Sequence, residues 1–130
     1  FCMVMVDLDR FKSVNDTYGN AVGDQVSVGI SQLFFHRLRS TDIVGRYGGE
    51  EFVIIMPNTS SDKAARVVER LRRDYEQVTF SVNDASFHST FSAGIAQWQF
   101  GDRIETLRER ADQALYAAKQ NGRNTFCTAE

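Results

Sequence analysis

Two adjacent carboxylates beside a glycine pair form the part of this sequence best suited to chemistry, at Gly48-Gly49-Glu50-Glu51. Glycines accept the backbone angles of tight turns and let a ligand approach the main chain closely. The β-prone run 52–56 follows at once, and residues 42–47 before the pair also have strand character. The pattern predicts a hairpin with acidic groups at its tip. A plain solvated turn is the competing interpretation.

A further carboxylate, Asp7, directly follows the apolar run 1–6. Open α/β sheets place their ligand sites beyond the carboxyl ends of strands. If this strand lies beside the hairpin, Asp7 and Glu50 converge, and a hard divalent cation would relieve the repulsion between them. Magnesium typically binds one or two protein carboxylates and leaves its other positions to water and phosphate oxygens. We interpret the neighbouring Asp9 and Asp16 as residues that cap or flank a helix.

Strands and helices alternate along the chain and must position these groups. Helical spacing of apolar residues predicts helices within 14–38, with a polar break around 15–20, and within 64–75 and 104–120. Residue types predict a strand at 87–98, a further short one at 78–82 and a last edge strand at 126–127. The order of elements predicts an α/β (α+β) domain with a mixed sheet flanked by helices.

Length and composition predict one globular domain over residues 1–130. A net charge of -2 and a pI near 5.7 give no general electrostatic reason to bind nucleic acid or an anionic membrane. Cys2 and Cys127 are far apart and are expected to be reduced, buried thiols, while His36 and His88 are isolated and no ligand candidates. No apolar run approaches the roughly 18 residues of a membrane span.

Five blocks in the same order resemble a known family. Residues 7–16 are similar to its Asp-x-Asp-x-Phe-Lys-x-x-Asn-Asp segment, and residues 18–24 to the stretch that follows. Residues 46–52 match its signature in the Glu variant, and the remaining blocks are matched by 91–96 and 111–124. On these blocks the chain is identified as a member of the GGDEF domains, the catalytic modules of bacterial diguanylate cyclases.

The resemblance implies a fold and a domain context. It implies a mostly antiparallel sheet of about five strands, similar to nucleotidyl cyclase and polymerase palm domains. Family members usually begin with a helical segment bearing Asp-x-Leu-Thr-Gly-Leu-x-Asn-Arg, which residues 1–130 lack. We therefore expect a cytoplasmic domain of a longer parent protein, with an unknown N-terminal sensory domain and, in the parent, a membrane anchor as one option.

The resemblance also implies a metal centre and an activity. Such enzymes condense two GTP molecules into cyclic di-GMP and pyrophosphate, as homodimers that use Mg²⁺, with Mn²⁺ as the alternative ion. By resemblance Asp7, Glu50 and the Leu8 carbonyl bind the metal, and Glu51 is a second metal contact. Glu50 and Lys12 are the expected catalytic residues. Whether Glu50 or a water bound to the metal accepts the 3′-hydroxyl proton stays open.

GTP recognition is carried over to residues on both sides of the signature. An amide at Asn15 and a carboxylate at Asp24 suit the guanine edge, because the carboxylate can accept from N1–H and the 2-amino group together. The family often has His where Asn20 stands. Phosphate binding is implied for Lys12, Lys119 and Arg123, main-chain groups near Arg10 and Phe11, and the glycine pair Gly48 and Gly49. A favourable cation at a helix C-terminus is the competing interpretation of Lys119 and Arg123.

A regulatory site is implied upstream of the signature. Arg39 and Asp42 match the family's Arg-x-x-Asp site for inhibition by the product, and Arg70 stands where some relatives supply a second arginine. A helix-end cation and a turn residue form the plain alternative. Two further hypotheses remain for the whole domain: an inactive module that binds GTP or cyclic di-GMP, and a cyclase that uses ATP. Asp24 favours GTP over ATP.

Overall fold

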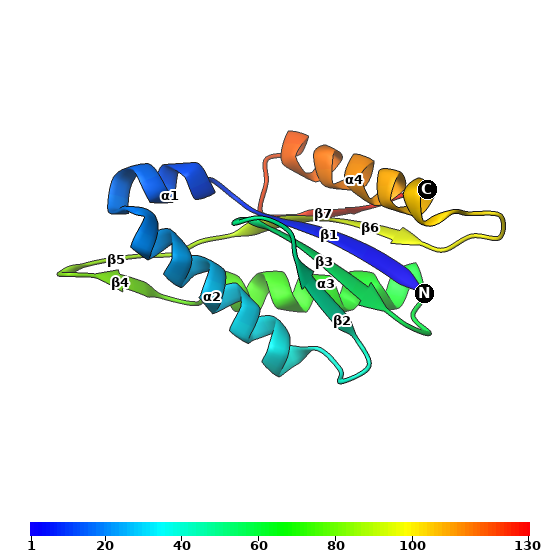
Figure 1. Ribbon diagram of the computed structural model, residues 1–130, viewed down its shortest axis with the longest axis horizontal. Coiled ribbons are helices and arrows are strands. Elements are labelled where there is room, and N and C mark those ends of the chain that lie inside the picture. Colours follow the sequence, from blue (N-terminus) through cyan, green and yellow to red (C-terminus); the bar gives the residue numbers. More distant parts are fainter.

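A five-stranded sheet forms the centre of the domain in a computed structural model that describes residues 1–130 (Figure 1). The strands, in the sheet order β2-β3-β1-β6-β7, are Ile43–Arg46, Glu51–Met56, Cys2–Leu8, Phe91–Gln97 and Phe126–Thr128. The central strand β1 pairs antiparallel with β3 and with β6. At one edge of the sheet β2 pairs antiparallel with β3, and at the other edge β7 runs parallel to β6. The predicted mixed, mostly antiparallel sheet is confirmed.

Helices cover both faces of this sheet (Figure 1). On one face, β1 and its neighbours pack against α2 (Asn20–Arg37) and α3 (Ser61–Glu76), where Val4, Val6 and Phe52 belong to the larger apolar cluster. On the other face, Met3 and Met5 pack with residues of α4 (Ile104–Gln120). The two sets alternate along β1 because successive strand side chains point to opposite faces.

This alternation places Asp7 on the α4 side of the sheet, two residues beyond Met5 at the end of β1. Its register partners are Glu51 on β3 and Ser92 on β6, so their side chains lie on the same face as the carboxylate of Asp7. The pairing of β1 with β3 therefore brings the two acidic segments of the sequence together, as predicted.

The predicted helix within residues 14–38 is wrong in its start and in the extent of its break. The structure has two helices, α1 (Phe11–Tyr18) and α2, separated only at Gly19, whose φ is 94°. Residues 15–18 of the polar run that indicated a break form the second half of α1 instead. Phe11 and Val14 pack partly against the larger apolar cluster, but α1 has only eight residues and none is fully buried, so it offers few positions at which a helical spacing can be recognised.

The predicted strand over residues 87–98 is wrong at its beginning. Only 91–97 form β6, whereas β5 (Ala85–Phe87) pairs with β4 (Phe80–Val82) in a separate two-stranded hairpin. The turn between β4 and β5 contains Asn83 at a φ of 53°. Residue types alone cannot tell one long strand from two short ones with different partners.

The predicted burial is confirmed for Cys2 and is wrong for Cys127. Cys2 is buried and donates to the carbonyl of Thr59 at 3.2 Å, whereas Cys127 on the edge strand is only half-buried. Burial raises the pKa of the Cys2 thiol. All four helices fall short of the length and apolar character that a membrane crossing requires.

Candidate active site

The glycine pair forms the tip of the hairpin between β2 and β3, and hydrogen bonds from α2, from β2 and from β1 hold this tip in place. Gly48 has a φ of 84°, in the region that favours glycine. The carbonyl of Gly49 accepts from Ser27 Oγ of α2 at 2.6 Å, and Arg46 Nε donates to the carbonyl of Gly48 at 3.1 Å. From β1, the Leu8 amide donates to the carbonyl of Glu50 at 2.9 Å. The hairpin tip is thus a positioned element rather than a free loop.

Asp7 and Glu50 converge beside this hairpin. Asp7 is 4% exposed, and its Oδ2 accepts from Lys119 Nζ at the end of α4. The pKa of Glu50 is raised, first by burial and then by the negative charges of Asp7 and Glu51, while Lys119 opposes the shift. Glu50 directly precedes Glu51, the register partner of Asp7, and its carbonyl accepts from the Leu8 amide, so the hairpin brings Glu50 to the end of β1 as predicted.

The arrangement fits a divalent cation held by few protein ligands. Asp7 Oδ1 is buried and has no hydrogen-bond partner, which leaves one carboxylate oxygen available beside Glu50. No group of three or more His, Cys, Asp or Glu side chains lies in a metal-binding arrangement. A divalent cation bound by Asp7 and Glu50 would therefore leave its other positions to oxygen ligands such as water or phosphate. Glu51, half-buried opposite Asp7 in the sheet, borders the same face.

The residues predicted to bind guanine meet where α1 packs on α2. Asn15 on α1 lies directly against Gly23 of α2, because a Cβ on Gly23 would be 1.8 Å from Asn15 Oδ1. Asn15 Oδ1 is buried without a hydrogen-bond partner. The next residue after Gly23 is the exposed Asp24, whereas Asn20 is exposed at the first residue of α2. The structure thus places Asn15 against the turn of α2 that also carries Asp24.

The junction of β1 and α1 lies under the hairpin tip. Arg10 adopts a left-handed conformation, with φ 56° and ψ 32°, at the N-cap of α1. The ring of Phe11 packs beneath Gly49, since a Cβ on that glycine would be 3.5 Å from it. Lys12 is exposed in the first turn of α1. The side chain of Phe11 thus connects the start of α1 to the glycine hairpin.

Arg123 lies beyond α4 in a turn that also contains Asn124. Both residues are left-handed, with φ of 65° and 47°. The amide of Arg123 donates to the carbonyl of Ala118 at 3.2 Å, and its side chain is exposed. Lys119, by contrast, contacts Asp7 directly from the last turn of α4, so it binds a specific carboxylate as well as lying at the helix C-terminus.

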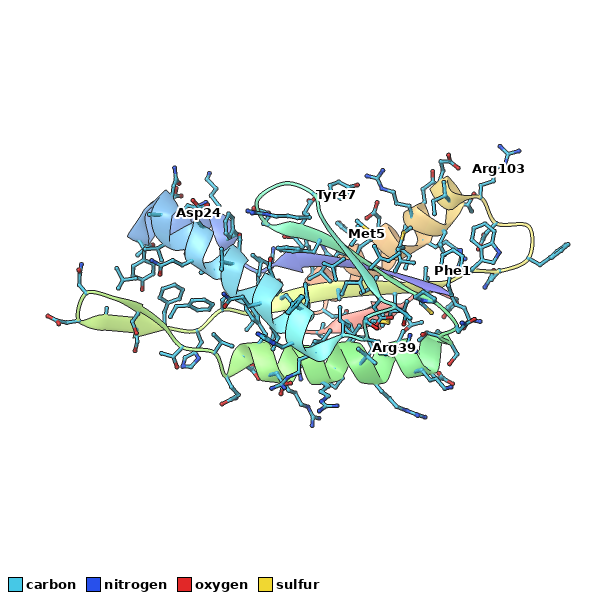
Figure 2. The ribbon with its side chains drawn as sticks, turned by 60° about the horizontal axis from the view of Figure 1, so that its bottom comes forward. Phe1, Met5, Asp24, Arg39, Tyr47 and Arg103 are labelled. Carbon is cyan, nitrogen blue, oxygen red and sulfur yellow. The ribbon has the colours of Figure 1, made fainter.

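The predicted regulatory pair forms a structured contact at the other end of α2. Arg39 Nη2 lies 3.0 Å from Asp42 Oδ1, and the guanidinium also donates to the carbonyl of Pro57 and to Thr59 Oγ1. The side chain of Arg39 stays 56% exposed, whereas that of Asp42 is 4% exposed. In Figure 2, Arg39 lies beside α3, well away from Asp24. Arg70 lines a hollow of about 470 Å³ on α3, of which Arg39 is not part.

Several positioning residues were missed by the sequence interpretation. Asp9 does not cap a helix. Its carboxylate is buried and accepts from Thr90 Oγ1 at 2.7 Å, Ser92 Oγ at 2.6 Å and the Asn124 amide at 2.9 Å. Ser27 likewise appeared to be an ordinary helix residue, yet it holds the hairpin. The only signal for Asp9 was its place two residues after Asp7, which does not reveal its distant partners.

Known proteins similar to this chain agree with the geometry. A family model described as "Diguanylate cyclase, GGDEF domain" matches residues 1–125. Diguanylate cyclase A of Treponema denticola is 40% identical over 123 residues, which cover 94% of this chain and 33% of that protein. Diguanylate cyclase DosC of Escherichia coli is 37% identical over 123 residues, 94% of this chain and 27% of that protein. The chain thus spans about a third or less of these curated relatives.

Solved structures share the whole fold. The GGDEF domain of DgcB from Caulobacter crescentus, in complex with c-di-GMP, is 32% identical with a TM-score of 0.94, over 98% of this chain and 76% of that one. The active GGEEF domain of a diguanylate cyclase from Vibrio cholerae is 35% identical with a TM-score of 0.92, over 99% and 82%. With its two carboxylates gathered at a glycine hairpin, this chain belongs to the GGDEF domain family of diguanylate cyclases.

Proposed function

We propose that this chain is the catalytic domain of a diguanylate cyclase that joins two GTP molecules into cyclic di-GMP and releases two pyrophosphates. Each 3′-hydroxyl attacks the α-phosphate of the other nucleotide. The observation that carries the proposal is the convergence of Asp7 and Glu50 beside the Gly48-Gly49 hairpin, with Asp7 Oδ1 buried and unpaired. Phosphoryl transfer depends mainly on positioning and on neutralising charge, which this arrangement suits.

The metal proposed for this site is Mg²⁺, with Mn²⁺ as the alternative. Asp7, Glu50 and the Leu8 carbonyl would hold it, and Glu51 is the proposed second contact. When bound, a divalent ion neutralises the charge that develops on phosphate oxygens during transfer. The proposed acceptor of the 3′-hydroxyl proton is Glu50 or a water molecule that the metal would hold beside it.

The chain's own residues bind and orient the nucleotide in this proposal. Asn15 and Asp24 would recognise the guanine edge, with Asn20 at its border. The triphosphate would lie on main-chain amides of the β1–α1 junction and of the glycine hairpin. The side chains that would neutralise its charge are those of Lys12, Lys119 and Arg123.

Product analysis tests the activity. The parent protein, supplied with GTP and magnesium, should form cyclic di-GMP, and the Glu50→Gln variant should form none while it keeps its circular dichroism spectrum. Competition between GTP and ATP decides the nucleotide. Binding of GTP without any turnover by a dimeric protein would overturn the cyclase proposal and favour a regulatory binding module.

Product inhibition is proposed through Arg39 and Asp42. Asp42 is nearly buried and fixes the Arg39 guanidinium, whose exposed part can still contact a guanine edge or phosphate. The Arg39→Ala variant should retain its initial rate and should continue to full conversion of GTP, where the unaltered protein slows as product accumulates. Identical progress curves for the two proteins would contradict the regulatory role.

A further inference from the structure

Two consecutive residues after α4 hold an unfavourable backbone conformation. Arg123 and Asn124 are both left-handed, directly after Gly122 at a φ of 108°. This conformation costs a residue such as Arg123 on the order of 1 kcal/mol and persists only where its surroundings hold it, whereas Asn tolerates it. The turn that carries Arg123 therefore needs anchors outside α4.

Asn124 supplies these anchors with every polar group of its side chain. Its Nδ2 donates to Glu76 Oε2 at 2.6 Å, and its Oδ1 accepts from Arg72 Nη1 at 3.0 Å. Arg72 is itself fixed, because it binds both carboxylate oxygens of Glu69. A guanidinium only donates and an ionised carboxylate only accepts, so the orientation of the Asn124 amide is determined by its partners. The turn is thereby tied to α3.

The backbone of the same residue is tied to β1. The Asn124 amide donates to Asp9 Oδ2 at 2.9 Å. Asp9 is 7% exposed and also accepts from Thr90 and Ser92, so its carboxylate cannot turn away. Asp7, two residues earlier on β1, binds Lys119. Asp7 at the end of β1 and Asp9 just beyond it therefore accept hydrogen bonds from residues 119 and 124, at the end of α4 and just beyond it.

We propose that Asn124, held by Asp9, Arg72 and Glu76, is a positioning residue that sets where Lys119 and Arg123 present their charges to the triphosphate. This inference rests on the proposed function of the site. Asn124 itself uses both ends of its amide on α3 and has no free group for the nucleotide. Its loss should consequently weaken nucleotide binding without removing a catalytic group.

The isosteric Asn124→Asp variant tests the inference. A carboxylate cannot donate to Glu76, and it would face that carboxylate at hydrogen-bond distance. We expect the KM for GTP, and the Kd for a non-hydrolysable GTP analogue measured by calorimetry, to rise about tenfold, whereas kcat changes less than about twofold. The double variant Asn124→Asp with Glu76→Gln restores a donor opposite the new carboxylate and should return both constants to within about twofold of the unaltered protein.

Two further variants separate positioning from charge and from misfolding. Asn121→Asp introduces the same charge on an exposed residue at the end of α4 and should change the Kd by less than about twofold, since exposed charges interact weakly. Asn124→Gly allows the left-handed backbone and keeps the hydrogen bond from the backbone amide to Asp9, but it loses the side-chain hydrogen bonds to α3. It should fold and raise the Kd several-fold.

Each outcome bears on a defined claim. An unchanged Kd in Asn124→Asp or Asn124→Gly, equal effects of Asn124→Asp and Asn121→Asp, or failure of Glu76→Gln to restore binding would overturn the positioning role. Absence of turnover in the unaltered protein would instead overturn the proposed function. The calorimetric comparison of the variants would still decide the role of Asn124 in nucleotide binding.

Discussion

At the scale of single residues, the site is a set of carboxylates kept close together against their repulsion. The negative charge of Asp7 is partly offset by its ion pair with Lys119. The ionised form of Glu50 is disfavoured by burial and by the negative charges of Asp7 and Glu51. Residues that are arranged this way serve function at a cost to stability. The cost can be measured separately from catalysis in protein without metal.

Glu50→Gln should stabilise the metal-free protein at alkaline pH. The pKa of Glu50 is raised in the folded state, so the folded chain binds the proton more tightly than the unfolded chain, and ionisation of Glu50 opposes folding as pH rises. With EDTA present, urea denaturation at pH 8 should show a gain of roughly 0.5 kcal/mol, discounted for partial solvent screening, which vanishes near pH 4. The exposed Glu109→Gln is the charge control, and a gain that persists at pH 4 would contradict this account.

Lys119→Gln should bind Mn²⁺ more tightly than the unaltered protein when no nucleotide is present. A divalent ion on the free oxygen of Asp7, Oδ1, would lie near the Lys119 ammonium on Oδ2 of the same carboxylate, and the two positive charges would repel each other. Removing a partly exposed ion pair of this kind should tighten metal binding by roughly threefold, as measured by electron paramagnetic resonance of free Mn²⁺. Lys12→Gln removes an equal charge that has no contact with Asp7. Equal tightening in both variants would show that net charge, and not the specific contact, controls affinity.

At the scale of elements, the site depends on how closely α4 lies on the sheet. A Cβ on Gly94 of β6 would be 2.1 Å from the carbonyl oxygen of Ala111 and 2.2 Å from the amide nitrogen of Leu115. Both obstacles are backbone atoms of α4, which cannot move aside as a side chain can. Gly94 is therefore the residue that lets α4, and with it Lys119, approach β1.

Gly94→Ala should destabilise the domain by about 2–3 kcal/mol, because the added methyl group forces α4 away from the sheet. Urea denaturation measures the loss. Gly45→Ala on the edge strand β2 is the matched control, since its Cβ would meet only Val53 Cγ1 at 3.1 Å, and it should cost less than about 1 kcal/mol. Equal losses in the two variants would show that the close approach of α4 carries no special weight.

The elements also show what the sequence could predict. Long apolar runs such as 52–56 and the spacing along α4 identified strands and helices whose buried faces dominate their composition. The short strand predicted at 78–82 is confirmed by β4, whereas α1 and β5 were misplaced, because both are short and neither contains a fully buried residue. The pairing of Asp7 with Glu50 followed from the sheet order, but the role of Asp9 did not. It depends on donors 81 to 115 residues away along the chain.

At the scale of the whole molecule, the proposed reaction exceeds what one copy provides. The domain has one such hairpin with its cluster of carboxylates, whereas the proposed reaction uses two nucleotides that attack each other. If each copy holds one GTP, the two copies must face each other with their hairpins opposed. A two-fold arrangement of this kind makes both halves equivalent.

The dimer requirement predicts how activity depends on protein concentration. At concentrations below the dimer dissociation constant, the initial rate of cyclic di-GMP formation should rise with the square of protein concentration, and above it in direct proportion, because only paired copies react. Adding excess Glu50→Gln protein to a fixed amount of unaltered protein should lower the rate severalfold, since a mixed dimer can form at most one of the two phosphodiester bonds. A rate that stays proportional to concentration throughout, and that is unaffected by the variant, would mean that one copy completes the reaction alone.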